Sequence, residues 1–263
     1  EGSLELRGKR MFMFGKQNED IHLIFYKDDI PFVNAKAKRF RMEDRRIYAE
    51  NSNIHISWAE DSIVHPQLKF IYSDSLQTLS FQRLKQKLGK SPIRSSYHKL
   101  DCYFDRMIWH KDSAHITFSN DKSPARNPAL LESFNFYNES RYKDIVTMAS
   151  RHPAFILRSM CRDHKGEKNF IISEIAKYYS YSLVDAAGLM SDFAILGFVD
   201  YDTDRNTILV KDKLFEFLDA RLEKRDYDGL KMVSRAETLP AASMDLETGD
   251  LSVSGVNIVE LSD

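Results

Sequence analysis

The sequence has few of the residues that usually build a metal or redox site. Among its 263 residues there are only two cysteines, Cys102 and Cys161, with 58 residues between them. A structural zinc site needs cysteines or histidines in closely spaced pairs, so this arrangement excludes a zinc cluster. A disulfide would need the two halves of the chain to pack together, and we expect two buried free thiols instead.

Glycine, long apolar runs and an excess charge of either sign are scarce as well. Ten glycines leave little material for a phosphate-binding loop, and no apolar run approaches the roughly 18 residues that span a bilayer. The 38 lysines and arginines nearly balance the 39 acids, so the chain has no overall field that attracts polyanions. We therefore expect no cofactor and no membrane span, and any charged partner has to bind a local patch.

Eight histidines are present, but no catalytic arrangement surrounds them. His98 stands near Ser95 and Ser96, yet no nucleophile elbow, oxyanion loop or ordered aspartate accompanies it. His110 and His115 have the wrong spacing for two ligands on one helix face. The sequence therefore predicts no catalytic residues and a protein that is not an enzyme.

One stretch, residues 170–211, has a clear order of elements. It begins with a short apolar strand and continues with a helix opened by Ser173 and a tight turn. A second helix follows, and then two strands are joined by a turn at residues 203–206. This order predicts a compact unit of two helices and a β-hairpin.

The ends of the second helix are marked by residues with defined roles. Ser182 and Asp185 have the spacing of a capping box, and Gly197 suits the left-handed residue that follows a helix. A further helix is expected over residues 153–164, with Pro153 in its first turn. Together these elements resemble a winged helix-turn-helix domain covering about residues 153–226.

The charges contradict the function that this resemblance implies. DNA-binding winged helices turn a basic second helix and a basic wing toward the phosphates. Residues 173–204, in contrast, contain six acids and the single base Lys177. The acids are Glu174, Asp185, Asp192, Asp200, Asp202 and Asp204. We therefore expect the module to contact proteins, and we do not expect nucleic acid as a partner.

The N-terminal half reads as short strands separated by polar turns. In residues 54–58 apolar residues alternate with His55 and Ser57, so we expect His55 to face solvent. The pattern predicts a sandwich, a jelly roll or a solenoid. The expected strands cover residues 4–6, 11–14, 21–26, 32–37, 47–49, 54–58, 68–72 and 76–81.

The two tryptophans begin similar phrases 51 residues apart. Trp58 and Trp109 are each followed, three and four residues later, by Asp-Ser and then by a further apolar stretch. Aspartate and serine favour turns because their side chains bond the backbone two residues on. The echo predicts a repeated strand–turn–strand unit with the tryptophans in equivalent positions.

Residues 47–51, Ile-Tyr-Ala-Glu-Asn before a new strand, resemble the repeats of lipopolysaccharide-transport jelly-roll proteins. The resemblance implies a place in the cell envelope, periplasmic or at the surface, in preference to the cytoplasm. Both ends of the sequence read as interrupted strands, so we expect an internal piece of a longer protein.

These patterns predict an α+β fold in four parts. A β-rich domain with the internal repeat is expected over residues 1–120, and a linker over residues 121–139. A winged-helix helical domain is expected over residues 140–228. Residues 229–263 would form a connector and the start of a further β repeat. The fold class is thus a jelly-roll or solenoid-like β-repeat domain followed by a winged-helix domain, with β structure resuming at the C-terminus.

Four segments complete the assignment. Residues 97–109 fit either a helix or a strand, and the repeat favours a strand. A helix is expected from Ser140 to about residue 149, whereas residues 227–242 show no clear element. Alternating apolar residues predict that residues 243–261 add strands to a β-sheet.

A run of bases between residues 83 and 99 contains no acid. Such a run is usually a solvated loop, and a site for an anionic glycan or lipid headgroup is the sharper alternative. The bases of this basic run are Arg83, Lys85, Lys87, Lys90, Arg94 and Lys99.

The sequence thus favours a non-enzymatic structural or interaction segment of a larger β-repeat protein. Its helical module would bind protein, either the rest of the parent chain or another subunit. Two alternatives remain open: a DNA-binding winged-helix regulator with a β sensor domain, and an envelope carrier of an anionic lipid or glycan.

Overall fold

The computed structural model describes residues 2–16, 19–85, 87–121, 128–145, 152–224 and 229–262. The chain forms two compact units. The first comprises residues 1–131 and 232–258, and the second comprises residues 132–231 and 259–263. The chain therefore leaves the first unit, builds most of the second and returns to the first.

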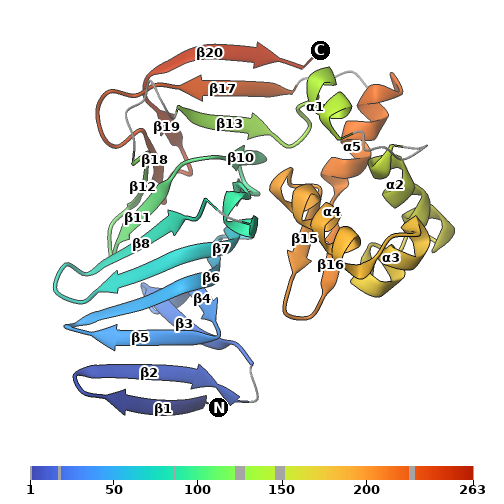
Figure 1. The fold of residues 1–263 in the computed structure, drawn as a ribbon. Coiled ribbons are helices and arrows are strands. Elements are labelled where there is room, and N and C mark those ends of the chain that lie inside the picture. Colours follow the sequence, from blue (N-terminus) through green and yellow to red (C-terminus); the bar gives the residue numbers. More distant parts are fainter. Residues whose placement is uncertain are drawn as a thin grey trace. The chain divides into compact units, whose positions relative to one another are not determined.

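Antiparallel strands build the first unit (Figure 1). Its strands are β1 (Gly2–Arg7), β2 (Arg10–Gly15), β3 (Ile21–Lys27), β4 (Ile30–Ala37), β5 (Arg39–Glu43), β6 (Arg46–Trp58), β7 (Asp61–Ser73), β8 (Thr78–Arg83), β9 (Ile93–Ser95), β10 (Leu100–Cys102), β11 (Arg106–His110), β12 (His115–Ser119), β18 (Ala242–Asp245) and β19 (Leu251–Val253), with a short helix η2 (Lys87–Lys90). Strands β13 (Ala129–Ser133), β17 (Leu230–Ser234) and β20 (Val256–Leu261) have residues in both units.

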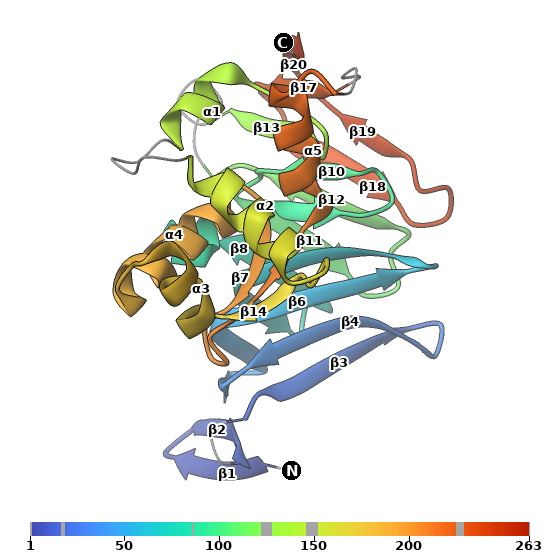
Figure 2. The same ribbon diagram turned by 90° about the vertical axis from the view of Figure 1, so that its right-hand side faces the viewer.

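Two long strands, β6 and β7, organise the first unit. Each has 13 residues, and the hairpin that they form shifts register near Ser52. Before the shift β6 pairs with β5, and after it β6 pairs with β4, which in turn pairs with β3 (Figure 2). Because an irregularity of this kind bends a strand, one hairpin serves two sets of strands.

The inward faces of these strands enclose an apolar core. Ile54 and Ile56 of β6 are buried, while His55 between them is exposed, as the alternation predicted. Trp109 is fully buried, and its ring centroid lies 4.6 Å from that of Phe32. Such aromatic contacts contribute beyond the burial of apolar area.

The strand predictions for this unit are confirmed in most places. Seven of the eight expected strands lie within observed strands, and the eighth begins at Thr78 instead of residue 76. The expected turn at residues 51–53 is instead the register shift inside β6. Residues 97–109 contain β10 and most of β11, so the preference for strand structure there is confirmed.

The predicted fold class is wrong. Antiparallel strands account for 47% of the chain and helices for 22%, and the described residues contain only five α-helices. A single sheet of 17 described strands takes in chain from both sides of the helical segment. The protein is therefore not a β-repeat domain followed by a winged-helix domain, because strands far apart in sequence complete the same sheet.

The return of the chain to the first unit is fixed by one strand pair. β18 pairs with β12 so that Met244 lies opposite Ile116, and β19 pairs with β18. The prediction that residues 243–261 add strands to a sheet is confirmed. The absence of an element over residues 227–242 is wrong, since β17 (Leu230–Ser234) lies there and pairs with β20.

The two tryptophan phrases form hairpins with different registers. Trp58 lies opposite Asp61, so its hairpin has a two-residue turn. Trp109 lies opposite Ile116, and Asp112 falls inside the longer turn with a φ of 65°. The Asp-Ser pair therefore begins a strand in one phrase and belongs to the turn in the other.

The second unit contains the helices. They are α1 (Glu139–Asp144), α2 (Pro153–Asp163), α3 (Ile172–Tyr179), α4 (Leu183–Ile195) and α5 (Asp212–Arg221). A three-stranded sheet in the order β14 (Asn169–Ile171), β16 (Thr207–Val210), β15 (Val199–Asp202) accompanies them. The apolar stripe expected on the second helix packs inward, since Ala186, Met190 and Phe193 are buried.

The predicted start of α4 is confirmed, whereas the predicted start of α3 is wrong. The Ser182 hydroxyl accepts a hydrogen bond from the Asp185 backbone N–H at 3.1 Å, and Gly197 has a φ of 76° after the helix. The helix α3 begins at Ile172 and not through Ser173, because the Glu174 carboxylate caps it by accepting from the Ile171 backbone N–H at 3.1 Å.

The expected linker over residues 121–139 contains the strand β13, so its assignment as a linker is wrong there. The next helix, expected from Ser140 to residue 149, is α1 and ends at Asp144; residues 146–149 lie outside the described part. A strand in place of a linker puts the Glu132 side chain in a fully buried position.

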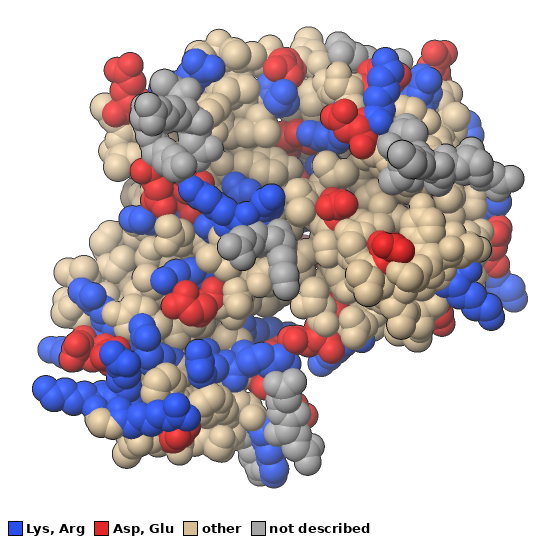
Figure 3. Space-filling model, viewed as in Figure 1, with Lys and Arg blue, Asp and Glu red and all other residues tan. Residues whose placement is uncertain are grey.

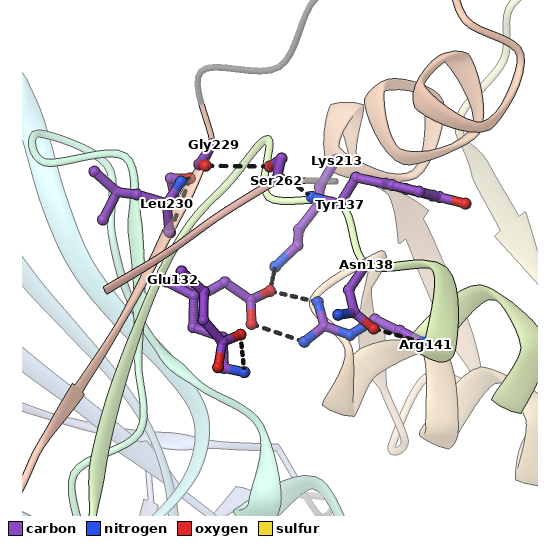
Figure 4. Close-up of polar contacts among 11 residues, drawn as sticks. Glu132, Tyr137, Asn138, Arg141, Lys213, Gly229, Leu230 and Ser262 are labelled. Carbon is purple, nitrogen blue, oxygen red and sulfur yellow. Dashed lines mark hydrogen bonds and ion pairs between the residues drawn. The ribbon is translucent and has the colours of Figure 1, made fainter. Parts of the chain in front are cut away.

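Glu132 is the centre of a buried ion cluster in the second unit (Figure 4). Both of its carboxylate oxygens accept from the Arg141 guanidinium, one at 2.7 Å, and the Lys213 ammonium lies 3.5 Å from one of them. Burial opposes ionisation, but the two cations outweigh it and hold the pKa of Glu132 below its ordinary value. The cluster joins β13, α1 and α5.

Both cysteines are free and buried, which confirms the prediction of two unpaired thiols. Burial raises the pKa of Cys102 and raises the pKa of Cys161 to about 11. Neither thiol is therefore ionised near neutral pH, and a thiolate is the reactive form of cysteine.

Candidate interaction surfaces

The basic run of residues 83–99 does not fold into one exposed patch. The Arg83 guanidinium donates to the Lys90 carbonyl at 2.7 Å and lies 5.3 Å from the Tyr103 ring centroid. The Arg94 guanidinium lies 3.9 Å from the buried carboxylate of Asp101. These two arginines thus serve contacts within the first unit.

The other bases of the run differ in exposure. Lys85, Lys90 and Lys99 are exposed, and the Lys87 side chain lies outside the described part. Lys99 is in a turn with a φ of 52°. An anion site on the basic run remains a prediction, and it would depend on these scattered lysines.

Histidine and serine meet in the first unit, but the contact is structural. The His98 Nε2–H donates to the Gly249 carbonyl at 2.8 Å, so Nδ1 accepts from the Ser95 hydroxyl at 2.9 Å. Ser95 is only 5% exposed. The Trp58 indole N–H also donates to the Leu246 carbonyl at 2.7 Å. These bonds hold the turn between β18 and β19 against the rest of the unit.

His65 is a second buried histidine with its two ring nitrogens occupied. Nε2 donates to the Ser91 carbonyl at 2.8 Å, and Nδ1 accepts from the Gln67 backbone N–H at 3.0 Å. Burial lowers the pKa of His65 to about 3. The ring is therefore neutral and acts as a hydrogen-bonding part of the core.

A groove of about 590 Å³ lies in the second unit, where residues of α2 and α5 line it. Two of its bases are already neutralised by acids of α5. The Arg158 guanidinium lies 2.7 Å from the Asp219 carboxylate, and the Lys168 ammonium lies 2.6 Å from that of Asp212. These two ion pairs reduce the positive charge of the groove, which Arg162 and Lys224 also line.

The N-terminal turn of α4 carries an exposed apolar surface. Leu183 is 60% exposed and Val184 is 80% exposed, while the next helical turn adds the exposed Gly188. Leu183 and Val184 are neighbours at the start of the helix, and adjoining exposed apolar side chains mark contact sites when they form a continuous patch. The outer face of α4 is therefore a candidate contact surface.

Acids are exposed on α4 and on the hairpin that follows it. Asp185 and Asp192 are exposed on α4, and Asp200, Asp202 and Asp204 are exposed on the β15–β16 hairpin. Two of the hairpin acids have partners: Lys211 pairs with Asp200, and the Arg205 guanidinium lies 3.9 Å from Asp202. We call α4 and this hairpin together the acidic face. Its negative charge excludes the neutralisation of phosphate groups as its role.

Sequence reasoning missed a second charged surface, on the N-terminal strands. Register places the outward residues of β1, β2, β5 and the start of β6 side by side. These residues, which we call the arginine face, are Glu5, Arg7, Arg10, Phe12, Phe14, Arg39, Arg41, Glu43, Arg46 and Tyr48. Alternation in Arg10–Phe12–Phe14 was the signal that could have found it.

Comparisons with family models, with curated proteins and with solved structures found no match for this chain. Within the described ranges, no helix is long and apolar enough to cross a membrane. The described residues also contain no group of three or more histidine, cysteine or acidic side chains placed to hold a metal ion. The exposed surfaces are therefore the features of the molecule that bear on its function.

Proposed function

We propose that this chain is a non-enzymatic interaction segment whose helix α4 binds another protein. The exposed pair Leu183 and Val184 carries the proposal. Burying an exposed side chain of this size stabilises a complex by about 1.5–3 kcal/mol, so the pair is sufficient for the centre of a small interface. Small interfaces of this kind concentrate their energy in a few central apolar side chains.

The surrounding charges select the partner. The exposed Asp185 directly follows the apolar pair and Asp192 lies on the same helix, so a complementary surface is apolar opposite the pair and basic beside it. Charged rims of this sort mainly raise the association rate and reject acidic partners. The partner is another protein surface, in the same polypeptide or in another subunit.

DNA binding by α4 is the alternative function, and it would require basic residues on this helix. The described part of α4 has two aspartates and no lysine or arginine. Each phosphate contact needs a cation, so duplex binding by this surface has no electrostatic support. The winged-helix resemblance and the envelope location remain predictions, since no comparison tests them.

A matched pair of experiments tests the proposal. Co-purification of the full chain from its native cells should lose its protein partner when Leu183 and Val184 are both changed to Asp. The variant should keep the wild-type unfolding temperature, because both side chains are already exposed. The control Lys177→Asp, on the exposed side of α3, should retain the partner.

A titration with labelled random duplex DNA tests the alternative. No salt-sensitive binding is expected at physiological salt. Submicromolar binding that is lost on changing α4 or the β15–β16 hairpin would overturn the proposal, as would a partner retained by the double Asp variant.

A further inference from the structure

We propose that the arginine face of the first unit is a binding surface for an acidic polysaccharide, a polymer that carries carboxylate or sulfate groups. In Figure 3, Lys and Arg side chains gather over the N-terminal strands. Three observations support the proposal: the composition of the face, its ring contacts, and the position of the exposed leucines of β1 on the opposite side of the sheet.

Strand register builds the face. Phe12 of β2 lies opposite Glu5 of β1 on one side and opposite Arg41 of β5 on the other. Arg41 in turn lies opposite Tyr48 of β6. Side chains of directly opposed residues share one side of a sheet, so these residues form a continuous row across four strands. The face measures about 20 Å along the strands and about 15 Å across them.

The cations on this face are all arginines. Five arginines stand against two glutamates, Glu5 and Glu43, which leaves an excess of three positive charges on the face. Arginine binds carboxylate and sulfate-like groups through two parallel hydrogen bonds, whereas lysine presents a single point charge. A face that uses arginine alone is suited to planar or branched oxyanions.

Aromatic rings order the guanidinium groups before any ligand binds. The guanidinium carbons of Arg7 and Arg39 lie 5.4 and 5.7 Å from the Phe12 ring centroid, and that of Arg41 lies 4.7 Å from the Tyr48 ring centroid. A guanidinium held against a ring loses less side-chain entropy when an anion binds. The contacts therefore favour binding without new protein structure.

The glutamates leave part of the charge available. Glu5 accepts from Arg7 at 2.7 Å, and Glu43 accepts from Arg10 at 2.7 Å. Among the described residues, no ion pair joins Arg39 or Arg46 to an acid. The paired arginines are exposed, and surface pairs of this kind are weak enough for an incoming anion to compete.

The same contacts argue against single-stranded nucleic acid and against a membrane. The guanidinium groups of Arg7 and Arg39, which come from the strands on either side of β2, lie over the Phe12 ring, where a base would have to stack. The exposed leucines of β1, Leu4 and Leu6, alternate with the outward residues and lie on the opposite side of the sheet. The rings of Phe12 and Phe14 on the arginine face are half-buried among charged side chains, and such a face fits a hydrophilic polyanion.

Dextran sulfate, with neutral dextran as the reference, is the probe for this surface. We expect the full chain to bind dextran sulfate and not dextran. The double variant R7Q/R39Q should weaken the binding by about tenfold. The double variant R7K/R39K keeps the charge and should still lose several-fold in affinity, because the paired hydrogen bonds are gone.

The double variant K85Q/K90Q is the matched control, since it removes two charges from the basic run in the same unit. It should change the affinity by less than about twofold. A larger loss in K85Q/K90Q than in R7Q/R39Q would overturn the proposal, and so would equal binding of dextran and dextran sulfate. Tighter binding of single-stranded DNA or of anionic phospholipid vesicles than of dextran sulfate would also overturn it.

Folding is checked separately in each variant. Tryptophan fluorescence reports the first unit, because both tryptophans lie there. An R7Q/R39Q protein that binds poorly but unfolds at the wild-type temperature supports the proposal. If the protein regains binding after it is refolded or stabilised, the loss came from misfolding, and the proposal is contradicted. The double Asp variant of Leu183 and Val184 should bind dextran sulfate normally, which separates this surface from the protein contact of α4.

Discussion

Replacing the buried Glu132 by glutamine should destabilise the second unit more than any single change of a surface acid. Glu132 is fully buried, and its Arg141 and Lys213 partners are 19% and 1% exposed in their side chains. Glutamine keeps the size of the side chain but removes the negative charge that faces the Arg141 guanidinium and the buried Lys213 ammonium. Breaking a buried ion pair from one side costs about 3–5 kcal/mol.

Glu139 provides the matched control. Its carboxylate lies 3.8 Å from both Lys143 and Arg221, and all three side chains are more than one third exposed. It also accepts a hydrogen bond from the Tyr137 hydroxyl, which the amide oxygen of a glutamine can accept as well. Ion pairs of this kind contribute about 0–1 kcal/mol, so Glu139→Gln should change the free energy of unfolding by less than about 1 kcal/mol. The double variant E132L/K213M removes the buried Lys213 ammonium together with the carboxylate, so it should recover part of the loss, while Arg141 still lacks the Glu132 carboxylate.

Urea unfolding followed by circular dichroism measures the effect. The described α-helices all belong to the second unit, so the helical signal reports that unit, while tryptophan fluorescence reports the first. A loss of less than about 1 kcal/mol in E132Q, equal to that in the Glu139 control, would refute the reasoning.

The pH dependence has a defined sign. The pKa of Glu132 is lower in the folded protein than in the unfolded chain, so its contribution is present above the unfolded value of about 4.3 and is lost as pH falls through the folded value. The E132Q variant should therefore lose less additional stability than the wild type when the pH is lowered through this range. A wild type and variant with parallel acid profiles would contradict the assignment.

Two further changes test the core and the helix caps. His65 has a folded pKa of about 3 and an unfolded value of about 6.5, so the unfolded chain binds more protons between these values, and wild-type stability should fall by about 1.4 kcal/mol for each unit by which the pH is lowered there. His65→Gln should flatten that slope in a fluorescence-monitored unfolding series, and an unchanged slope would exclude His65 as its source. Ser182→Ala removes the cap of α4 and should cost about 1 kcal/mol, whereas Ser173→Ala should change little, since Ser173 caps no helix; equal losses in helical stability from the two variants would contradict the observed helix start.

Local features of the fold were predictable from the sequence because short-range physics determines them. Alternation identified the strands around Ile54 and Ile56, and the spacing of Ser182 and Asp185 identified the start of α4. The order of the sheet was not predictable in this way. The pairing of Thr117 with Ser243 joins residues far apart in the chain, and no local pattern records it.

The two charged surfaces show the same limit. The basic run is contiguous in sequence, but folding turns Arg83 and Arg94 toward partners inside the first unit. The arginine face is dispersed in sequence, and only the pairing of β2 with β5 brings Phe12 beside Arg41. Charge counts along a chain therefore mislead when strand register decides which side chains share a surface.

Site-specific photo-crosslinking at Val184 tests the central claim most directly. A photoreactive amino acid at this position of the full chain, in its native cells, should give one discrete protein adduct, because Val184 is 80% exposed on α4. The same group at Glu223, an exposed residue after α5, should not give that adduct. A DNA adduct at position 184, or the same protein adduct at both positions, would contradict the account.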